Sequence, residues 1–335
     1  MSLKTYIIAR ILLAVPMVLI LLTVVFVIMR VIPGDPVLTL LGGKAPIEVI
    51  EAKRHELGLD KPIMVQYGEY LLNLFKGDLG KSLLTERPII EELGDRLPAT
   101  VELTIMGFII ALVIGIFWGV EAARRHDTAF DLSARVYSIF IYSVPVFWLG
   151  MVFQLVFGVW LKWLPVAGRI PPLMEPKHIT GMYLFDALLT ANWDSAREAL
   201  RHLILPSVTL GLVISSVFVR MVRGNMVLSL SQDFVKAARA RGIKERAVVY
   251  RHALKNAMVP IMTVLGLQLA LLFAGAVLTE TTFSWPGIGT YLIQKIRYRD
   301  FMAVQGAIVI YALIVVTLSI VVDIVNAWID PRIRY

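Results

Sequence analysis

Six apolar runs, each about 20 residues or longer, constrain the fold of this chain more than any other feature. They cover residues 9–31, 101–122, 134–161, 203–222, 257–279 and 304–326. A helix of about 20 apolar residues crosses the hydrocarbon core of a bilayer. The chain is 58% hydrophobic and only 17% charged, whereas a soluble domain carries about a quarter charged residues. The pattern therefore predicts an all-α integral membrane protein with six transmembrane helices.

Basic residues are spread unevenly between the loops, and this predicts the orientation. Residues 220–257 carry nine Lys or Arg and two acids, whereas residues 31–100 mix eight Lys or Arg with eleven acids. Short cytoplasmic loops are enriched in Lys and Arg. We therefore expect the basic loops at 123–133 and 220–257, and both termini, on the cytoplasmic side. This predicts an N-in, C-in, multi-pass protein of the cell membrane, and it explains the net charge of +8 without nucleic-acid binding.

The polar segment 31–100 is predicted to be a large, partly helical outer loop. Pro62 can begin a helix, and apolar residues recur at helical spacing from Ile63 until Gly77 can end it. Such a helix could lie on the outer membrane face, cover the mouth of the bundle or bind a partner. The chain thus divides into the first transmembrane helix with its outer loop, 1–100, and a core transmembrane domain, 101–335.

Small residues recur every four positions within three of the apolar runs, which favours a tightly packed bundle. These series are Gly107, Ala111, Gly115 and Gly119; Ser207, Gly211 and Ser215; and Gly266, Ala270 and Ala274. Small residues let helix backbones approach closely in lipid, where the hydrophobic effect does not drive helix association. Pro145 lies well inside the third run and predicts a kink there.

Several classes of site are poorly supported by the sequence. Ion-coupled carriers usually need ionisable residues in the middle of the membrane, but the acidic residues of the runs lie near their ends. The chain has no H-E-x-x-H or G-x-S-x-G motif and no cysteine. Gly80-Lys81-Ser82 looks like the end of a phosphate-binding loop, but Phe75 stands where that motif needs glycine. We therefore expect no catalytic, cofactor-binding or metal-binding residues.

A basic stretch between the fourth and fifth apolar runs, residues 233–260, has the features of a docking element. Asp233 can cap the start of a short helix, and Gly242 can end it in the left-handed conformation that glycine adopts easily. Ala237 and Ala238 present a low profile, so another protein's backbone could come close. The stretch predicts a cytoplasmic helix of about two turns that binds a partner protein.

This stretch resembles the EAA loop of ABC importer permeases, in which Glu-Ala-Ala is followed after three residues by glycine and later by proline. Ala237, Ala238, Gly242 and Pro260 match, while Lys236 stands in place of Glu. The stretch is more similar still to dipeptide and oligopeptide permeases, which have D-[YF]-V-R-x-A-R-A-K-G-L followed by R-H-A-L-x-N-A. The matching residues are Asp233, Phe234, Val235, Ala238, Arg239, Ala240, Gly242, Arg251, His252, Ala253, Leu254, Asn256 and Ala257.

Further motifs that resemble this family lie along nearly the whole chain. They are IPGDP at 32–36, LGLDKP at 57–62, GDLGKSL at 77–83, RLPAT at 96–100, FSWPGIG at 283–289 and DPRIRY at 330–335. The IPGDP and GDLGKSL motifs, together with the long first outer loop, suggest the first of the family's two paired permeases.

The resemblance implies a transport subunit that performs no bond chemistry itself. With a second homologous permease it would form a pathway for di- or oligopeptides. Two separate ATP-binding subunits would hold ATP and Mg²⁺, and an outer solute-binding protein would deliver the substrate. Alternatives are the same machinery carrying nickel chelates or oligosaccharides, and an ion-coupled secondary carrier. Membrane lipid is a further expected partner.

The resemblance also assigns residue roles. The short helix at about 233–242 would dock into a groove of an ATPase subunit, whose ATP-driven closure would switch the bundle from inward-open to outward-open. The implied ATPase-coupling residues are Asp233, Phe234, Lys236, Ala237, Ala238, Arg239, Arg241, Gly242 and Arg246. In FSWPGIG, Phe283, Trp285 and Pro286 could form a gate or vestibule of the pathway, or simply a tight structural turn.

Overall fold

The computed structural model describes residues 3–31, 37–38 and 45–329, apart from some side chains within the helices. The regular structure of these residues is helical, with one isolated β-bridge between Lys81 and Pro88. The motifs predicted at 32–36 and 330–335 lie outside the described residues. The helices of the N-terminal part are α1 (Leu3–Val31), α3 (Ile47–Glu56) and α4 (Ile63–Phe75).

The rest of the chain forms a helical bundle. Its first half contains α5 (Ile89–Arg124), α6 (Ala129–Ser143), α7 (Val146–Phe153), the π-helical η1 (Gln154–Trp160), the short 3₁₀ helix η2 (Pro172–Met174) and α8 (Tyr183–Leu189). Its second half contains α9 (Trp193–Leu230), α10 (Asp233–Ala240), α11 (Glu245–Ala247), the π-helical η3 (Val248–Ala253), α12 (Leu254–Thr282), α13 (Ile288–Arg297) and α14 (Phe301–Ile329).

Within the described residues, five helices are long and apolar enough to cross a membrane: α1, α5, α9, α12 and α14. The third apolar run, expected as one helix over 134–161, is instead broken. α6 and the following α7–η1 helix meet at 101°, because Val144 is extended and Pro145 follows it. A residue before proline is pushed out of the helical region. This bent pair makes a sixth span if it crosses the membrane as one unit.

The small-residue series in α5 and α9 lie where these two helices pack against each other. Among the described residues, α5 and α9 make the most extensive helix–helix contact. A β-carbon added to Gly115 would lie 2.3 Å from the β-carbon of Phe218, and one added to Gly211 would lie 2.7 Å from the carbonyl oxygen of Gly107. Only a glycine fits at such distances. The predicted close packing is therefore confirmed for this pair. In the third series Gly266 packs against Val322, while the side chains of Ala270 and Ala274 lie outside the described ones.

The outer helix predicted to follow Pro62 is present as α4, and it packs against α1. The Tyr67 hydroxyl lies 2.6 Å from Thr23 Oγ1, and the Tyr67 and Tyr70 rings both contact Phe26. Gly77 has φ +78° just beyond the helix, as expected of a stop. These contacts fix α4 to the end of α1.

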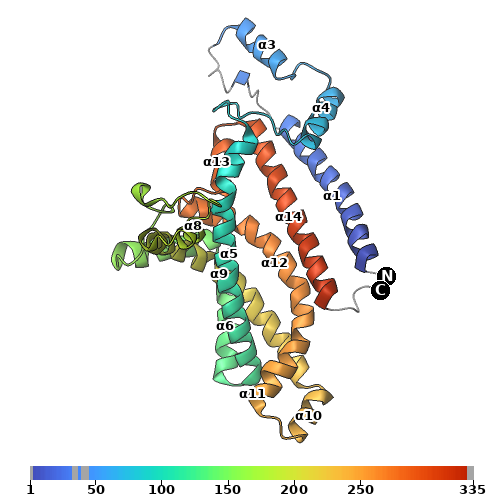
Figure 1. Cartoon of the computed structure of the whole chain (residues 1–335), viewed down its shortest axis with the longest axis vertical. Coiled ribbons are helices and arrows are strands. Elements are labelled where there is room, and N and C mark those ends of the chain that lie inside the picture. The colour runs from blue at the N-terminus through green and yellow to red at the C-terminus, as the bar shows by residue number, and fades with distance from the viewer. Residues whose placement is uncertain (1–2, 32–36, 39–44, 330–335) are drawn as a thin grey trace.

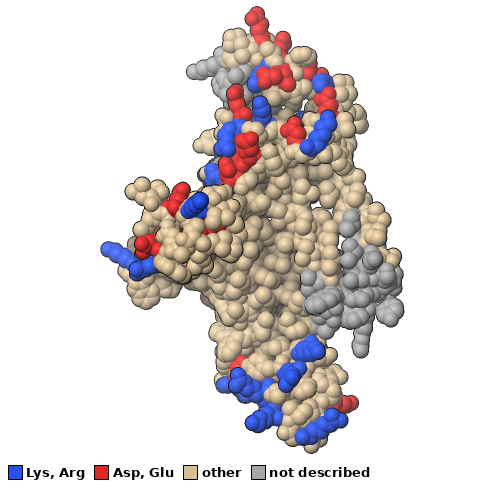
Figure 2. Space-filling model, in the orientation of Figure 1, with Lys and Arg blue, Asp and Glu red and all other residues tan. Residues whose placement is uncertain are grey.

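The helices run between two chemically different ends (Figure 1). One end carries α3 and α4, and the other carries α10 and α11. Figure 2 shows blue basic side chains gathered at the α10 end, whereas acidic and basic side chains mix at the α3–α4 end. α8 and its flanking loops project from the side of the bundle, and α1 and α14 lie side by side.

Candidate coupling helix

α10 is the short helix predicted between the fourth and fifth apolar runs, and it lies at the basic end of the bundle (Figure 1). Its N-cap residue is Gln232, which makes no side-chain capping bond, so the prediction that Asp233 caps the helix is wrong. Asp233 is instead the first helical residue, where a negative charge favours the helix dipole. Its carboxylate accepts a hydrogen bond from Lys236 Nζ at 2.9 Å, and both side chains are exposed.

The helix ends at Gly242, as predicted. Gly242 has φ +72°, and its N–H donates to the carbonyl oxygen of Arg239 at 2.9 Å. The next N–H, of Ile243, donates to the carbonyl oxygen of Ala238 at 3.3 Å. This pair of bonds is the Schellman arrangement. A β-carbon on Gly242 would meet no atom within 4 Å, so the backbone conformation, not crowding, requires glycine here.

One face of α10 packs against the bundle. Val235 is fully buried and Ala238 is 7% exposed, and both belong to a core cluster with Val248 and Val249 of η3. Burial of a side chain such as valine stabilises by roughly 1.5–3 kcal/mol. α10 is therefore held in a fixed position before any partner arrives.

The other face of α10 is open. Phe234 is 41% exposed, and Ala237, three residues further on, is exposed beside it. Residues three apart lie on the same helix face. Ala238, expected from the sequence to contact a partner together with these two, is turned toward the chain's own core. The outward surface is thus formed by an aromatic ring beside a small side chain.

Arginines surround this open face. Arg239 donates two hydrogen bonds to the carboxylate of Glu245, at 2.7 and 3.1 Å, and so joins the end of α10 to α11. These hydrogen bonds hold the pKa of Glu245 below its ordinary value. Arg241 and Arg246 are exposed, and neither has an ion-pair partner in the described part of the chain. The surface around α10 therefore keeps a net positive charge.

α10 is connected to both of the long helices that flank it. Ser229 Oγ, near the end of α9, donates to the carbonyl oxygen of Ala253 at 2.9 Å, immediately before α12. Beside this contact lies a groove of about 620 Å³, lined by residues that include Phe234, Arg251 and Lys255. α10 and η3 share one packed cluster with residues of α9 and α12.

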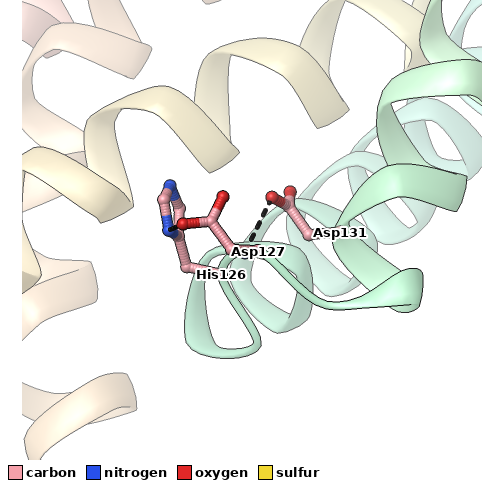
Figure 3. Close-up of side chains that lie close together, drawn as sticks. All are labelled: His126, Asp127 and Asp131. Atoms are coloured by element: carbon pink, nitrogen blue, oxygen red, sulfur yellow. Dashed lines mark hydrogen bonds and ion pairs between the residues drawn. The ribbon is translucent and has the colours of Figure 1, made fainter.

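The turn between α5 and α6 and the first turn of α6 bring together three residues that could in principle hold a metal ion: His126, Asp127 and Asp131 (Figure 3). Only Asp131 is buried, and both of its oxygens accept hydrogen bonds from Arg223, each at 2.8 Å. Asp131 Oδ2 also accepts from the backbone N–H of Asp127. Because the guanidinium of Arg223 already balances the charge of Asp131, this group is a brace between α6 and α9 rather than a metal site.

The FSWPGIG turn lies between α12 and α13 and is firmly packed. Phe283 and Trp285 are each 1% exposed, and Pro286 is half-buried. Trp285 Nε1 donates to the carbonyl oxygen of Ala99 at 2.9 Å. The carbonyl oxygen of Phe283 accepts from the N–H of Gly168 at 3.0 Å. The structure thus brings this motif together with RLPAT, which lies about 185 residues earlier.

A buried carboxylate organises the same turn. Glu280 accepts hydrogen bonds from Thr100 Oγ1 at 2.6 Å and from the N–H of Thr290 at 3.1 Å. Thr100 Oγ1 in turn accepts from the N–H of Ile288, the first residue of α13, at 2.8 Å. A β-carbon on Gly287 would lie 2.3 Å from the Glu280 carboxylate. The sequence analysis gave Glu280 no role. Its position just before the FSWPGIG motif was the available signal for one.

The buried ion pair between Arg169 and Glu102 was also missed by the sequence analysis. Arg169, in the loop before α8, donates from Nε to Glu102 Oε2 at 3.0 Å, and both residues are less than a tenth exposed. The guanidinium of Arg169 lies 3.8 Å from the ring centre of Tyr183. The N–H of Leu184 donates to the other oxygen of Glu102 at 2.7 Å. These bonds fix the projecting loop to α5.

Comparison with known proteins identifies the family. Residues 111–335 match the family described as the inner membrane component of binding-protein-dependent transport systems, and residues 3–104 match its N-terminal family. The chain belongs to this family. It is 41% identical to the dipeptide transport system permease protein DppB of Alkalihalophilus pseudofirmus over 98% of this chain and 99% of that one.

Two further relatives agree with this assignment. The chain is 43% identical to the di/tripeptide transport system permease protein DppB of Pseudomonas aeruginosa, over 92% of this chain and 93% of that one. It is 37% identical to the dipeptide transport system permease protein DppB of Escherichia coli K12, over 98% of each. The predicted resemblance is confirmed, and the chain is a multi-pass inner-membrane transport component.

Proposed function

We propose that this chain is the permease subunit of an ATP-binding-cassette importer for di- or oligopeptides, and that it forms the pathway with a second homologous permease. The observation that carries the substrate class is the near full-length similarity to permeases named for dipeptide and di/tripeptide transport. Nickel chelates, oligosaccharides and ion-coupled transport were the alternatives, and no feature of the described residues favours them.

We further propose that α10 couples the chain to one of two separate ATP-binding subunits, which hold ATP and Mg²⁺. The docking surface consists of Phe234 and Ala237, with Arg241 and Arg246 at its edge. Val235 and Ala238 fix the helix to the bundle, and the Asp233–Lys236 and Arg239–Glu245 pairs hold its two ends. Its packing against η3 supports this role, because movement of α10 then moves α9 and α12 as one body.

The same proposal includes six spans with both termini in the cytoplasm. The bent α6–α7 pair then crosses as one span, and the basic end in Figure 2 is cytoplasmic, as expected of Lys- and Arg-rich short loops. Residues 1–100 comprise the first transmembrane helix and a long outer loop, and residues 101–335 form the core transmembrane domain. A solute-binding protein docks at the outer end, where Phe283, Trp285 and Pro286 form a fixed wall of the vestibule.

Replacement of Gly242 tests the coupling proposal. Gly242→Arg places a long cationic side chain at a position with left-handed backbone conformation, whereas Gly242→Asn introduces a residue that tolerates this conformation. With the full transporter in proteoliposomes, we expect Gly242→Arg to lose ATPase subunits on purification, or to hydrolyse ATP without transporting peptide, while Gly242→Asn keeps most of its transport. A well-folded Gly242→Arg variant with normal subunit binding and transport would contradict the proposal.

A further inference from the structure

A cleft between α6 and α9 combines an apolar wall with three arginines. It encloses about 340 Å³ and is lined by residues of both helices: Ala134, Arg135, Ser138, Ile139, Val219, Arg220, Arg223 and Gly224. Arg135, Ser138 and Ile139 follow helical spacing and so share one face of α6.

The charge of the cleft is not balanced within the described part of the chain. Arg223 is bonded to Asp131, and Arg135 lies 3.7 Å from the same carboxylate. Arg220 has no acidic partner among the described residues; its guanidinium lies 5.3 Å from the ring centre of Tyr142. Asp127, four residues before Asp131, is exposed and pairs with His126. Three guanidinium groups thus line the cleft, and only those of Arg135 and Arg223 lie near the buried Asp131 carboxylate.

The surroundings of the cleft are those of a lipid-facing surface. Next to it on α6, Ile139 and Phe140 are 66% and 63% exposed. A polar ligand alone would not need such an apolar wall, whereas an acyl chain can lie along it. A homologous permease would bring its own basic residues to this membrane level, since short cytoplasmic loops are basic. Repulsion between like charges therefore disfavours a second permease at this place.

We propose that this cleft binds the headgroup of an anionic phospholipid from the inner leaflet. Arg220 contacts the lipid phosphate, Arg135 adds positive potential, and an acyl chain lies against Ile139. Basic pockets between transmembrane helices on the cytoplasmic side suit anionic headgroups. The proposal rests on the cytoplasmic placement of the α10 end and on no other part of the proposed function. The negative charge of the bound lipid phosphate would balance the positive charge of the arginines between α6 and α9.

The test uses the full chain purified in detergent with its co-purifying subunits and stripped of lipid. Native mass spectrometry then counts bound dioleoyl phosphatidylglycerol and dioleoyl phosphatidylcholine at increasing concentrations. Two variants probe the cleft. Arg220→Gln removes the unpaired charge, and Gly224→Leu fills the cleft from a position where a β-carbon would meet no atom within 4 Å. Lys244→Gln removes an exposed charge near α10, outside the cleft, and is the matched control.

Wild type is expected to retain phosphatidylglycerol in preference to phosphatidylcholine. Arg220→Gln should bind it about five-fold more weakly, the effect expected of one basic side chain at an anionic surface. Gly224→Leu should lose the preference, and Lys244→Gln should keep it. Equal retention of both lipids, unchanged binding by both cleft variants, or full displacement by inorganic phosphate would overturn the proposal. Loss of the lipid on pairing with the second permease would also overturn it, because the cleft would then be a subunit interface.

Discussion

Replacing Gly115 with alanine tests whether the close approach of α5 and α9 stabilises the bundle. The new β-carbon would lie 2.3 Å from the β-carbon of Phe218, where ordinary contact begins near 3.4 Å. Phe218 is 1% exposed and cannot swing aside, so α9 must move by about 1 Å. Overpacking of this kind costs roughly 1–3 kcal/mol. The better helix propensity of alanine returns at most about 1 kcal/mol, so the expected net loss is up to about 2 kcal/mol.

The assay is thermal unfolding of the purified chain in detergent, followed by tryptophan fluorescence. Gly115→Ala should lower the apparent Tm by several degrees. The control is Gly224→Ala on α9, which makes the same chemical change where a β-carbon would meet no atom within 4 Å. It should leave the Tm unchanged or raise it slightly. If Gly115→Ala is as stable as wild type, or both variants lose stability equally, the reasoning about close approach is refuted.

Three further predictions concern two side-chain pairs and the FSWPGIG turn between α12 and α13. Arg223→Leu removes both guanidinium hydrogen bonds to the buried Asp131 carboxylate and leaves it only Arg135, at 3.7 Å, as an ion-pair partner, so it should cost up to about 3–5 kcal/mol. A thermal scan should show partial recovery when Asp131→Ala is added, and no recovery would contradict the pairing. The Arg239–Glu245 pair lowers the pKa of the Glu245 carboxyl in the folded chain. The stabilisation of the fold by this pair is therefore complete above the pKa of an unfolded Glu, roughly 4, and is lost as the pH falls through the lower pKa of the folded chain. Hydrogen exchange around residue 242 should therefore be constant from pH 6 to 8 once corrected for intrinsic rates, and a rise in opening there would argue against this pair. Trp285→Phe removes one buried hydrogen bond and should lower stability by about 1–2 kcal/mol with transport per folded molecule unchanged, whereas a large selective loss of transport would indicate a moving gate.

Hydrophobic patterning was sufficient to predict the long helices, because about 20 apolar residues suffice to cross a bilayer. It did not predict their full lengths. α5 begins at Ile89 and α9 ends at Leu230, well outside the apolar runs, because both helices continue through polar residues that apolar patterning does not mark. Pro145 was recognised as a source of a kink, but the size of the bend, 101°, was not predicted.

The short helix α10 was predictable because its stop is a local backbone requirement at Gly242. The inward orientation of Ala238 was not, since it depends on η3 lying beneath it. The buried ion pairs were missed for a similar reason. Arg169 and Glu102 are 67 positions apart, and Arg223 and Asp131 are 92 apart. No periodicity connects residues at such separations, and only the folded chain brings them together.

The measurement that tests the coupling account most directly is cross-linking from single cysteines, because the chain contains no cysteine of its own. Ala237→Cys on the open face of α10 would carry a thiol-linked photo-cross-linker in the assembled transporter. Leu173→Cys, fully exposed in the projecting loop, is the control in a segment that the account does not assign to ATPase docking. The account predicts that Ala237→Cys links to an ATP-binding subunit and that Leu173→Cys does not. No link from Ala237→Cys, or links to that subunit from both positions, would contradict it.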